Sequence, residues 1–357
     1  MSRDKISLWS TEGGSDKTYT LWIEKDQKGC WLKYLFGPRG GTQNQGTKNK
    51  VAFTPEKAEK EYDKILKEKL AKGYKPLGGD VPEYVEVKEA KDAGIRPMLL
   101  TPDTEENLEK YITDDDWCAE EKLNGVRIMI KADGDRIVGV NRRGLERPIP
   151  KSVEKALLGA LKPGDVLDGE LIGENYHVFD IPLAKGSYSM RLGLLDLLAK
   201  KVKALNIRFV PAFSSQKDKR ALVQSLQKNR KEGVVFKDLR ADYEPGRREN
   251  LAKAIAVKVK YYAEVAAQVI DWTDKQSVEV ALLDSQKLVS VGKVTVPTKY
   301  VDQVRKGELV RVKYLYATGA KQLYQAHLDP TDDGSVIADA EKPDPITALK
   351  FEGREEE

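Results

Sequence analysis

The chain has 357 residues, of which 40% are hydrophobic and 33% charged. This length exceeds that of one small module, and the balance is that of a folded, water-soluble protein rather than a disordered one. No run approaches the roughly 20 apolar residues that a membrane span needs, and the first residues contain no apolar core of signal-peptide length. We therefore expect two or three domains, no membrane partner and no export.

Cysteine and histidine are scarce. Cys30 and Cys118 are the only cysteines, and His177 and His327 the only histidines. These numbers exclude a disulfide framework and a four-cysteine zinc site, and they leave little material for a Ser-His-Asp arrangement. We expect a reducing, cytoplasmic setting (nucleoid-associated in a bacterium or phage, with a nucleus left open) and chemistry that rests on lysine, arginine and carboxylates.

Residues 1–76 predict a module of strands and one helix. Aromatic and apolar residues favour strands over Tyr19–Ile23 and Trp31–Phe36. Thr54 is typical of a helix N-cap, Pro55 of the first helical position and Gly73 of a helix end.

The same module contains a basic segment without Asp or Glu from Gln27 to Pro55. Cations there alternate with aromatic residues, which suits a phosphate backbone, although a basic run can equally form a solvated face. The candidate DNA-binding residues in this segment are Lys33, Arg39, Lys48 and Lys50.

Residues 77–93 read as a linker, because glycine and proline interrupt any periodic pattern. Residues 94–262 alternate β-rich runs with helical patterns such as Arg191–Leu205 and Gln216–Lys228, which predicts a mixed α and β domain. A second basic stretch, Lys200–Lys231, has Asp218 as its only acid. The candidate DNA-binding residues in this stretch are Lys217, Lys219 and Arg220.

Four strand patterns after Tyr262 predict a small barrel over residues 263–340, and residues 341–357 read as an acidic tail. The whole is therefore an α+β multidomain chain.

The densest chemical signal is the run from Glu120 to Arg127, in which Lys122 precedes Asn124-Gly125. A lysine before a tight turn, with an arginine five residues on, is a candidate nucleophile toward phosphate. Alone this pattern is weak, but further charged motifs follow it in order. They are Asn141-Arg142-Arg143-Gly144, Asp168-Gly169-Glu170-Leu171, Phe179-Asp180, Glu232-Gly233-Val234-Val235-Phe236-Lys237 and Lys258-Val259-Lys260.

This ordered set resembles the covalent nucleotidyltransferase superfamily of ATP-dependent DNA ligases, RNA ligases and capping enzymes. The resemblance implies a nucleotidyltransferase core of the ATP-grasp-like DNA ligase type, with Lys122 as the lysine that becomes adenylylated. It implies nucleotide or phosphate contacts by Glu120, Arg127, Arg142, Glu170, Phe179, Lys258 and Lys260, with Phe179 stacked on adenine and Glu120 recognising it. It also implies metal contacts by Glu170 and Glu232.

The physical case agrees with the resemblance. Lysine attacks only as the neutral amine, so neighbouring cations or burial must lower its pKa from about 10.4. Carboxylates such as Glu170 and Glu232 suit Mg²⁺, with Mn²⁺ as an alternative. ATP is expected rather than NAD, since two cysteines cannot form the zinc finger that NAD-dependent ligases contain.

Two flanking resemblances complete the organisation. Residues 1–76 resemble the WGR domain, a DNA-binding module, although the Trp-Gly-Arg triplet is represented only by Phe36-Gly37-Pro38-Arg39. Residues 263–340 resemble the OB-fold of the same ligases, but Thr331-Asp332-Asp333-Gly334 stands where the family has Arg-x-Asp-Lys. Lys293 and Lys321 are candidates to replace that motif, and Asn124 departs from the family's Asp.

The sequence thus predicts a monomeric ATP-dependent DNA ligase that seals 5′-phosphate/3′-hydroxyl nicks in nicked or broken duplex DNA through a lysyl-AMP intermediate. Two alternatives stay open. One is an ATP-dependent RNA ligase with the same lysyl-AMP chemistry, and the other is a DNA-end-binding protein with a decayed transferase core.

Overall fold

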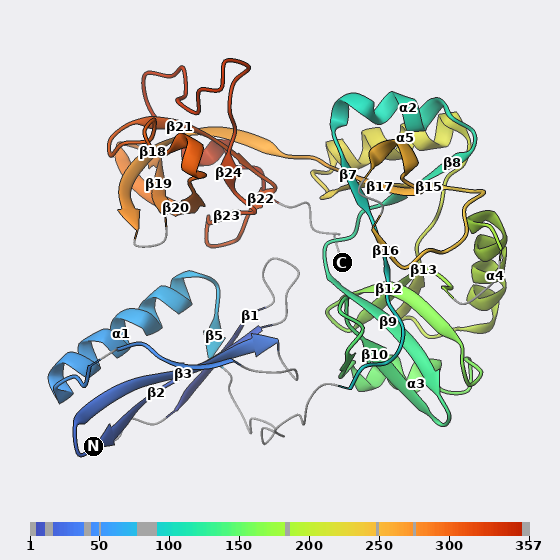
Figure 1. The fold of residues 1–357 in the computed structure, drawn as a ribbon, viewed down its shortest axis with the longest axis horizontal. Helices are drawn as coiled ribbons and strands as arrows, with labels where there is room; N and C mark the ends of the chain where they lie inside the picture. Colours follow the sequence, from blue (N-terminus) through green and yellow to red (C-terminus); the bar gives the residue numbers. More distant parts are fainter. Residues whose placement is uncertain are drawn as a thin grey trace.

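The fold was analysed in a computed structural model, which describes residues 5–10, 17–38, 44–49, 51–76, 91–182, 186–247, 250–273 and 276–351. The chain forms an N-terminal module, a two-sheet core and a C-terminal barrel (Figure 1). None of the described helices is long and apolar enough to cross a membrane.

The N-terminal module is a five-stranded sheet covered on one face by a helix. The strands are β1 Ile6–Ser10, β2 Lys17–Asp26, β3 Gly29–Pro38, β4 Asn44–Thr47 and β5 Lys75–Pro76, in the order β4-β3-β2-β1-β5. Helix α1, Pro55–Ala71, begins where the sequence predicts, because the Thr54 side chain accepts from the Lys57 N–H. Alternate residues of β2 point to the helix, so that Leu21 packs with Tyr62 in the module's core.

The first half of the core is a four-stranded sheet in the order β7-β17-β15-β8. Its strands are β7 Thr101–Asp103, β8 Trp117–Glu121, β15 Gly233–Asp238 and β17 Ala256–Lys260. Two helices, α2 Leu108–Thr113 and α5 Gln216–Lys228, cover it, and α5 has the bounds that the sequence predicts. Buried apolar residues such as Phe236 and Leu226 join sheet and helices.

The second half is a six-stranded sheet in the order β11-β10-β9-β12-β13-β14. Its strands are β9 Val126–Asp133, β10 Arg136–Val140, β11 Glu146–Arg147, β12 Val166–Ile172, β13 Asn175–Asp180 and β14 Ile207–Phe209. Helices α3, Lys151–Leu157, and α4, Tyr188–Lys201, pack on it. Helix α4 lies a few residues earlier than predicted. A short parallel pair, β6 Met98–Leu99 and β16 Gly246–Arg247, lies between the two sheets in Figure 1.

The C-terminal part is a closed barrel, as the sequence predicts. It consists of β18 Ala263–Thr273, β19 Ser277–Asp284, β20 Lys287–Thr295, β21 Leu309–Tyr314 and β24 His327–Leu328, ordered β18-β19-β20-β24-β21. A hairpin of β22 Tyr316–Ala317 and β23 Leu323–Tyr324 projects from it. The short 3-10 turns among the described residues are η2 Glu105–Asn107, η3 Leu251–Lys253, η4 Thr298–Tyr300 and η5 Ile346–Ala348.

The predicted boundary at residue 340 is wrong. Ile346 and Leu349 are buried in the barrel core, and the Leu283 N–H donates to the Asp344 carbonyl at 2.9 Å. Apolar residues within the acidic stretch therefore keep the chain on the barrel as far as Phe351, which bridges to Ala317. The predicted linker falls largely on residues 77–90, which lie outside the described residues.

Candidate active site

A cavity of about 570 Å³ lies where the two core sheets meet the barrel. Its walls come from β8, β15 and β17 of one sheet and from β9, β12 and β13 of the other. Tyr324 and Gln325 of the barrel complete the lining. All the nucleotide and metal residues predicted from the sequence line this one cavity: Glu120, Lys122, Arg127, Arg142, Glu170, Phe179, Glu232, Lys258 and Lys260.

Lys122 lies on the loop that carries the chain from β8 into the other sheet. Its N–H donates to the Gly233 carbonyl at 3.0 Å, which fixes the loop to β15. Its Nζ lies 2.7 Å from Glu232 Oε1, and Lys260 Nζ lies 2.9 Å from the same oxygen. One buried carboxylate oxygen thus holds two ammonium groups together on the cavity wall.

Two glycines permit this close approach of strands. A Cβ on Gly125 would lie 2.6 Å from the Leu171 carbonyl oxygen, and one on Gly233 would lie 2.1 Å from that of Val259. A side chain on Gly125 would push the lysine loop away from β12, and one on Gly233 would push the start of β15, next to Glu232, away from β17.

Glu170 stands on β12 opposite Arg127 of β9, and its Oε1 accepts from the Gly125 N–H at 3.1 Å. Burial raises the pKa of the Glu170 carboxyl to about 7, and the nearby Glu232 carboxylate adds to the rise. Lys122 and Arg127 oppose it. The two glutamates therefore share one electrostatic environment.

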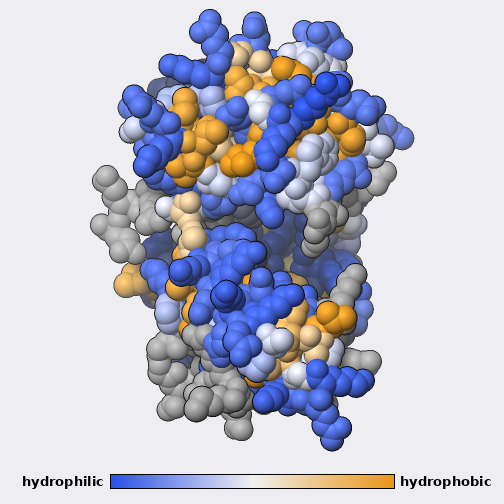
Figure 2. Space-filling model, turned by 90° about the vertical axis from the view of Figure 1, so that its left-hand side faces the viewer, coloured by the Kyte–Doolittle hydropathy of each residue, from blue (hydrophilic) through white to orange (hydrophobic). Residues whose placement is uncertain are grey.

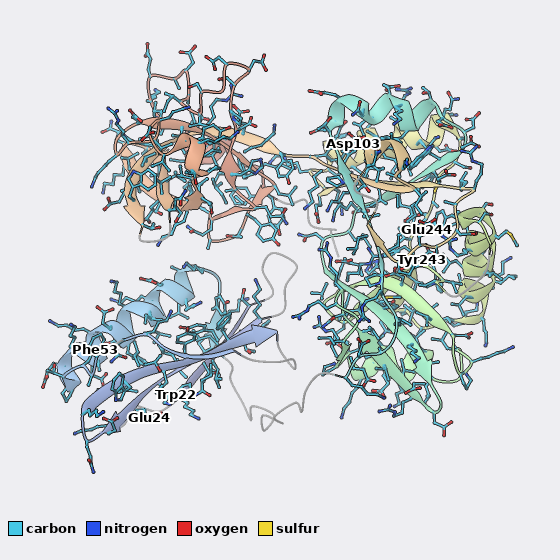
Figure 3. All side chains as sticks on the ribbon, viewed as in Figure 1. Trp22, Glu24, Phe53, Asp103, Tyr243 and Glu244 are labelled. Atoms are coloured by element: carbon cyan, nitrogen blue, oxygen red, sulfur yellow. The ribbon has the colours of Figure 1, made fainter. Side chains whose placement is uncertain are left out.

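The Arg127 side chain is fixed by an ion pair with the fully buried Asp168. The guanidinium donates twice to this carboxylate, at 3.0 and 2.6 Å, and lies 5.1 Å from the Phe179 ring. Tyr243 donates to Asp168 at 2.6 Å and accepts from the Met98 N–H at 2.8 Å. Figure 3 shows Tyr243 between the two sheets, where it links the β6 segment to β12. The predicted contact of Arg127 with a phosphate stays a prediction.

Glu120 belongs to a buried polar network behind Phe179. Its Oε2 lies 2.9 Å from Lys237 Nζ, and its Oε1 accepts from the Tyr188 hydroxyl. Lys237 also donates to the Tyr188 hydroxyl at 3.0 Å and to the Phe179 carbonyl at 3.1 Å. Because both partners are nearly inaccessible, at 3% and 4% exposure, burial raises the pKa of Glu120.

The barrel touches the cavity through amide and phenol groups. Lys260 donates to Gln325 Oε1 at 2.8 Å, and Asn124 donates to the Tyr316 hydroxyl at 2.9 Å. The Tyr316 and Tyr324 rings stack with centroids 4.8 Å apart. The Asn124 that departs from the family pattern thus contacts the barrel.

The cations considered as replacements for the missing C-terminal motif do not line the cavity. Lys293 is exposed on β20, and Lys321 Nζ lies 3.4 Å from Asp284. Neither is among the residues around the cavity.

The predicted DNA-binding residues fall in two places. Lys33 is half-buried on β3, and the exposed Lys48 lies with its Nζ 4.6 Å from the Tyr34 ring centroid. Arg39 and Lys50 lie outside the described residues. Figure 2 shows that the N-terminal module presents mainly hydrophilic residues on one side, whereas the barrel also exposes apolar ones.

The prediction for Lys219 is wrong. Its side chain is fully buried, and its Nζ donates to the carbonyls of Tyr111, Asp114 and Trp117 at 3.0, 2.6 and 2.9 Å. These contacts satisfy the C-terminal end of α2 and leave no group for DNA. Lys217 is exposed, while Arg220 is exposed but paired with Glu109.

Sequence reasoning missed several cavity residues and their supports. Asp168 shares a face of β12 with Glu170 by the two-residue period of a strand, so this alternation was an available signal. Lys237 ends the Glu232 to Lys237 motif but received no role, and Tyr188, Tyr243 and Gln325 gave no local signal, since their partners are distant in sequence.

No protein-family model matches the chain, and no curated protein matches it. Solved structures do. A structure from a structure-function analysis of Lig E DNA ligases has 18% identity, covers 65% of this chain and 97% of its own, and has a TM-score of 0.50. Another, named Pmar-Lig_Pre, has 20% identity, covers 66% of this chain and 67% of its own, and has a TM-score of 0.52. About two thirds of the chain therefore has the fold of these two structures.

Proposed function

Because the chain has the fold of DNA ligases, we propose that it is an ATP-dependent DNA ligase that seals 5′-phosphate/3′-hydroxyl nicks through a lysyl-AMP intermediate. The observation that carries the proposal is the pair of ammonium groups, Lys122 and Lys260, on one oxygen of Glu232 in the cavity wall. A nucleophile, a phosphate-binding cation and a carboxylate therefore lie close enough together to act on the same phosphate group.

The cavity suits a nucleotide in size and in polarity. Its volume of about 570 Å³ lies in the usual range of small-molecule sites. The Phe179 ring and apolar side chains such as Val235 line the cavity for the base, with Glu120 as a hydrogen-bond acceptor for an exocyclic amine. Lys122, Lys258 and Lys260 line it as cations for the phosphates.

This arrangement supports the proposed first step. Lys122 Nζ attacks the α-phosphorus of ATP, a P–N bond forms, the bond to the bridging oxygen breaks and pyrophosphate leaves. The proton that Nζ must lose has Glu232 Oε1 as an acceptor 2.7 Å away. Lys258 and Lys260 stabilise the charge that accumulates on the phosphate oxygens.

The next steps use the same cations. The 5′-phosphate of the broken strand displaces Lys122 from AMP, which gives a DNA–adenylate. The 3′-hydroxyl then attacks that phosphate, so that AMP leaves and a phosphodiester remains.

Glu170 and Glu232 fit a divalent cation, because both carboxylates line the cavity and Glu232 contacts the lysines proposed to bind the phosphates. Among the described residues no group of three or more His, Cys, Asp or Glu side chains surrounds a metal position. Two carboxylates together with substrate phosphates are what Mg²⁺ usually takes in proteins, and Mn²⁺ accepts the same ligands. A bound cation would neutralise phosphate charge.

Duplex DNA is the proposed substrate, with the protein acting as a monomer. The N-terminal module, proposed as WGR-like, carries Lys33 and Lys48 beside aromatic rings, and Figure 3 shows Trp22 and Glu24 on the sheet face away from α1. The five-stranded barrel has the strand number of an OB-fold. Contacts from both parts to the backbone would give affinity without sequence preference.

The proposal is tested by incubating the protein with α-labelled ATP and Mg²⁺. We expect an acid-labile protein–AMP adduct that Lys122→Ala abolishes and the surface control Lys217→Ala retains. Glu170→Ala and Glu232→Ala should each slow adduct formation by about 10²-fold or more. An adduct that persists in Lys122→Ala contradicts the nucleophile assignment, and its absence in the wild-type protein favours a DNA-end-binding protein.

The nucleic acid is tested separately by single-turnover sealing of matched nicks with DNA or RNA on each side of the break. Faster sealing of nicked duplex DNA supports the proposal. A clear preference for an RNA 3′-hydroxyl strand or an RNA template supports the RNA ligase instead.

A further inference from the structure

Helix α4 is apolar on both of its faces. Leu195 is buried in the core, whereas Met190, Leu194 and Leu197 on the outer face are 62%, 42% and 62% exposed. They are three of the eleven exposed large apolar side chains among the described residues. Figure 1 shows α4 at the outer edge of the core, and a helix that is apolar all round is typical of one covered on both sides.

Gly193 lies in the middle of this outer face. With Met190, Leu194 and Leu197 it occupies positions i, i+3, i+4 and i+7, the four positions that surround a hole into which a facing helix inserts a side chain. Apart from its two chain neighbours and the backbone of α4 itself, no described atom lies within 4 Å of the place where its Cβ would stand. Glycine disfavours a helix interior, and nothing described in this chain uses the space that it leaves. The hole is therefore open toward solvent.

The C-terminal end of α4 is positively charged, with Lys200 and Lys201 in its last turn and Lys203 just beyond it. Lys200 and Lys203 are exposed and form no ion pair with any described residue, while Lys201 Nζ donates to the Ala160 carbonyl at 2.6 Å. That contact joins the end of α4 to the segment after α3. Leu158 and Leu205, which are 55% and 92% exposed, lie on the connecting segments at this end and extend its apolar character.

These charges argue against a second copy of the chain as the occupant. In a parallel pair of α4 helices the lysines would face lysines. In an antiparallel pair they would face the first turn, which contains no acidic residue. Asp196, exposed one turn before Lys200, is the one acidic residue of α4, so a second copy offers a single carboxylate per helix. A partner with several carboxylates complements the lysines better.

We propose that the outer face of α4 binds a helix of a partner protein, which places an apolar side chain in the hole around Gly193 and acidic side chains against Lys200 and Lys203. No residue of α4 lines the active-site cavity, so the partner leaves that cavity open. The proposal is independent of the reaction catalysed.

The test uses the full-length protein and two fluorescein-labelled helical peptides of about 21 residues with the same leucine ridge. One peptide carries glutamate and the other lysine at the positions that flank the ridge. Fluorescence anisotropy should give a Kd at least about tenfold lower for the glutamate peptide. Leu194→Glu should weaken its binding by a similar factor, while Leu288→Glu, at a 48% exposed leucine of the barrel, should not.

Gly193→Gln separates the hole from the stability of the helix. Glutamine is a good helix former, so this variant should melt at a higher temperature than the wild type while binding the glutamate peptide about tenfold less tightly. Protein–AMP formation should be unchanged in all three variants. Equal affinity for both peptides, binding of neither, or full binding by Leu194→Glu overturns the proposal. A dimer in light scattering that Leu194→Glu dissociates would overturn it in favour of a second copy.

Discussion

Replacing Lys237 by methionine should destabilise the core far more than the loss of one surface lysine would. Its Nζ lies 2.9 Å from Glu120 Oε2 and donates to the Tyr188 hydroxyl and the Phe179 carbonyl. Methionine keeps much of the volume but removes the charge. The Glu120 carboxylate, 3% exposed, is then left without a counter-charge.

The expected cost follows from this burial. Removing one partner of a buried ion pair costs about 3–5 kcal/mol, because it strands the other charge. This is a large part of the roughly 5–15 kcal/mol that stabilises a typical protein. The cost should decrease toward acidic pH, because burial already raises the pKa of Glu120 and a protonated carboxyl needs no counter-charge.

Urea unfolding of Lys237→Met, Glu120→Gln and the double variant measures these effects. The double variant should recover about 2 kcal/mol or more of the loss in Lys237→Met, since the neutral amide can still accept from Tyr188. A loss below about 1 kcal/mol in Lys237→Met, or no recovery in the double variant, would refute the stranded-charge argument.

Three further predictions concern charge. The pKa of about 7 for Glu170, against 4.5 for the ordinary carboxyl, means that the folded chain binds more protons than the unfolded one between these values. The free energy of unfolding of the protein should therefore fall by up to about 3 kcal/mol as pH rises from 4.5 to 7. Urea unfolding of Glu170→Gln should lack this loss, and equal slopes of unfolding free energy against pH in the two proteins would contradict the prediction. Lys219→Met should cost about 3 kcal/mol in the same assay with unchanged DNA affinity of the folded protein, whereas Lys217→Met should cost almost nothing; weaker DNA binding by folded Lys219→Met would restore the original prediction. Lys33→Gln with Lys48→Gln should reduce the slope of log binding constant against log salt by about two, and an unchanged slope would assign the module to protein contacts.

Local signals located much of this fold because they act within a few residues. The Thr54 cap and Pro55 predict the start of α1, and the apolar period predicts α5 with its observed bounds. The boundary at residue 340 was predicted wrongly, because the acidic composition of the following stretch outweighed its two buried apolar residues, Ile346 and Leu349, which pack in the barrel core.

The candidate site shows the same division. The ordered motifs around Lys122, Glu170 and Glu232 indicated the cavity residues through their joint resemblance to covalent nucleotidyltransferases, whereas each motif alone is weak. The sequence did not indicate that Arg127 is held by Asp168, or that Lys219 is an internal ligand of three carbonyls rather than a DNA contact.

By itself, then, the sequence determined which residue types stand at which strand ends and helix caps, and hence the candidate chemistry. Only the tertiary structure decided which charges face which. A lysine at a helical position has the same local pattern whether its ammonium meets water, a carboxylate or a helix end, and the choice depends on strands far away in the chain. Glu232 became the common partner of Lys122 and Lys260 because antiparallel pairing aligns β15 with both β8 and β17, a contact set by packing of the whole sheet.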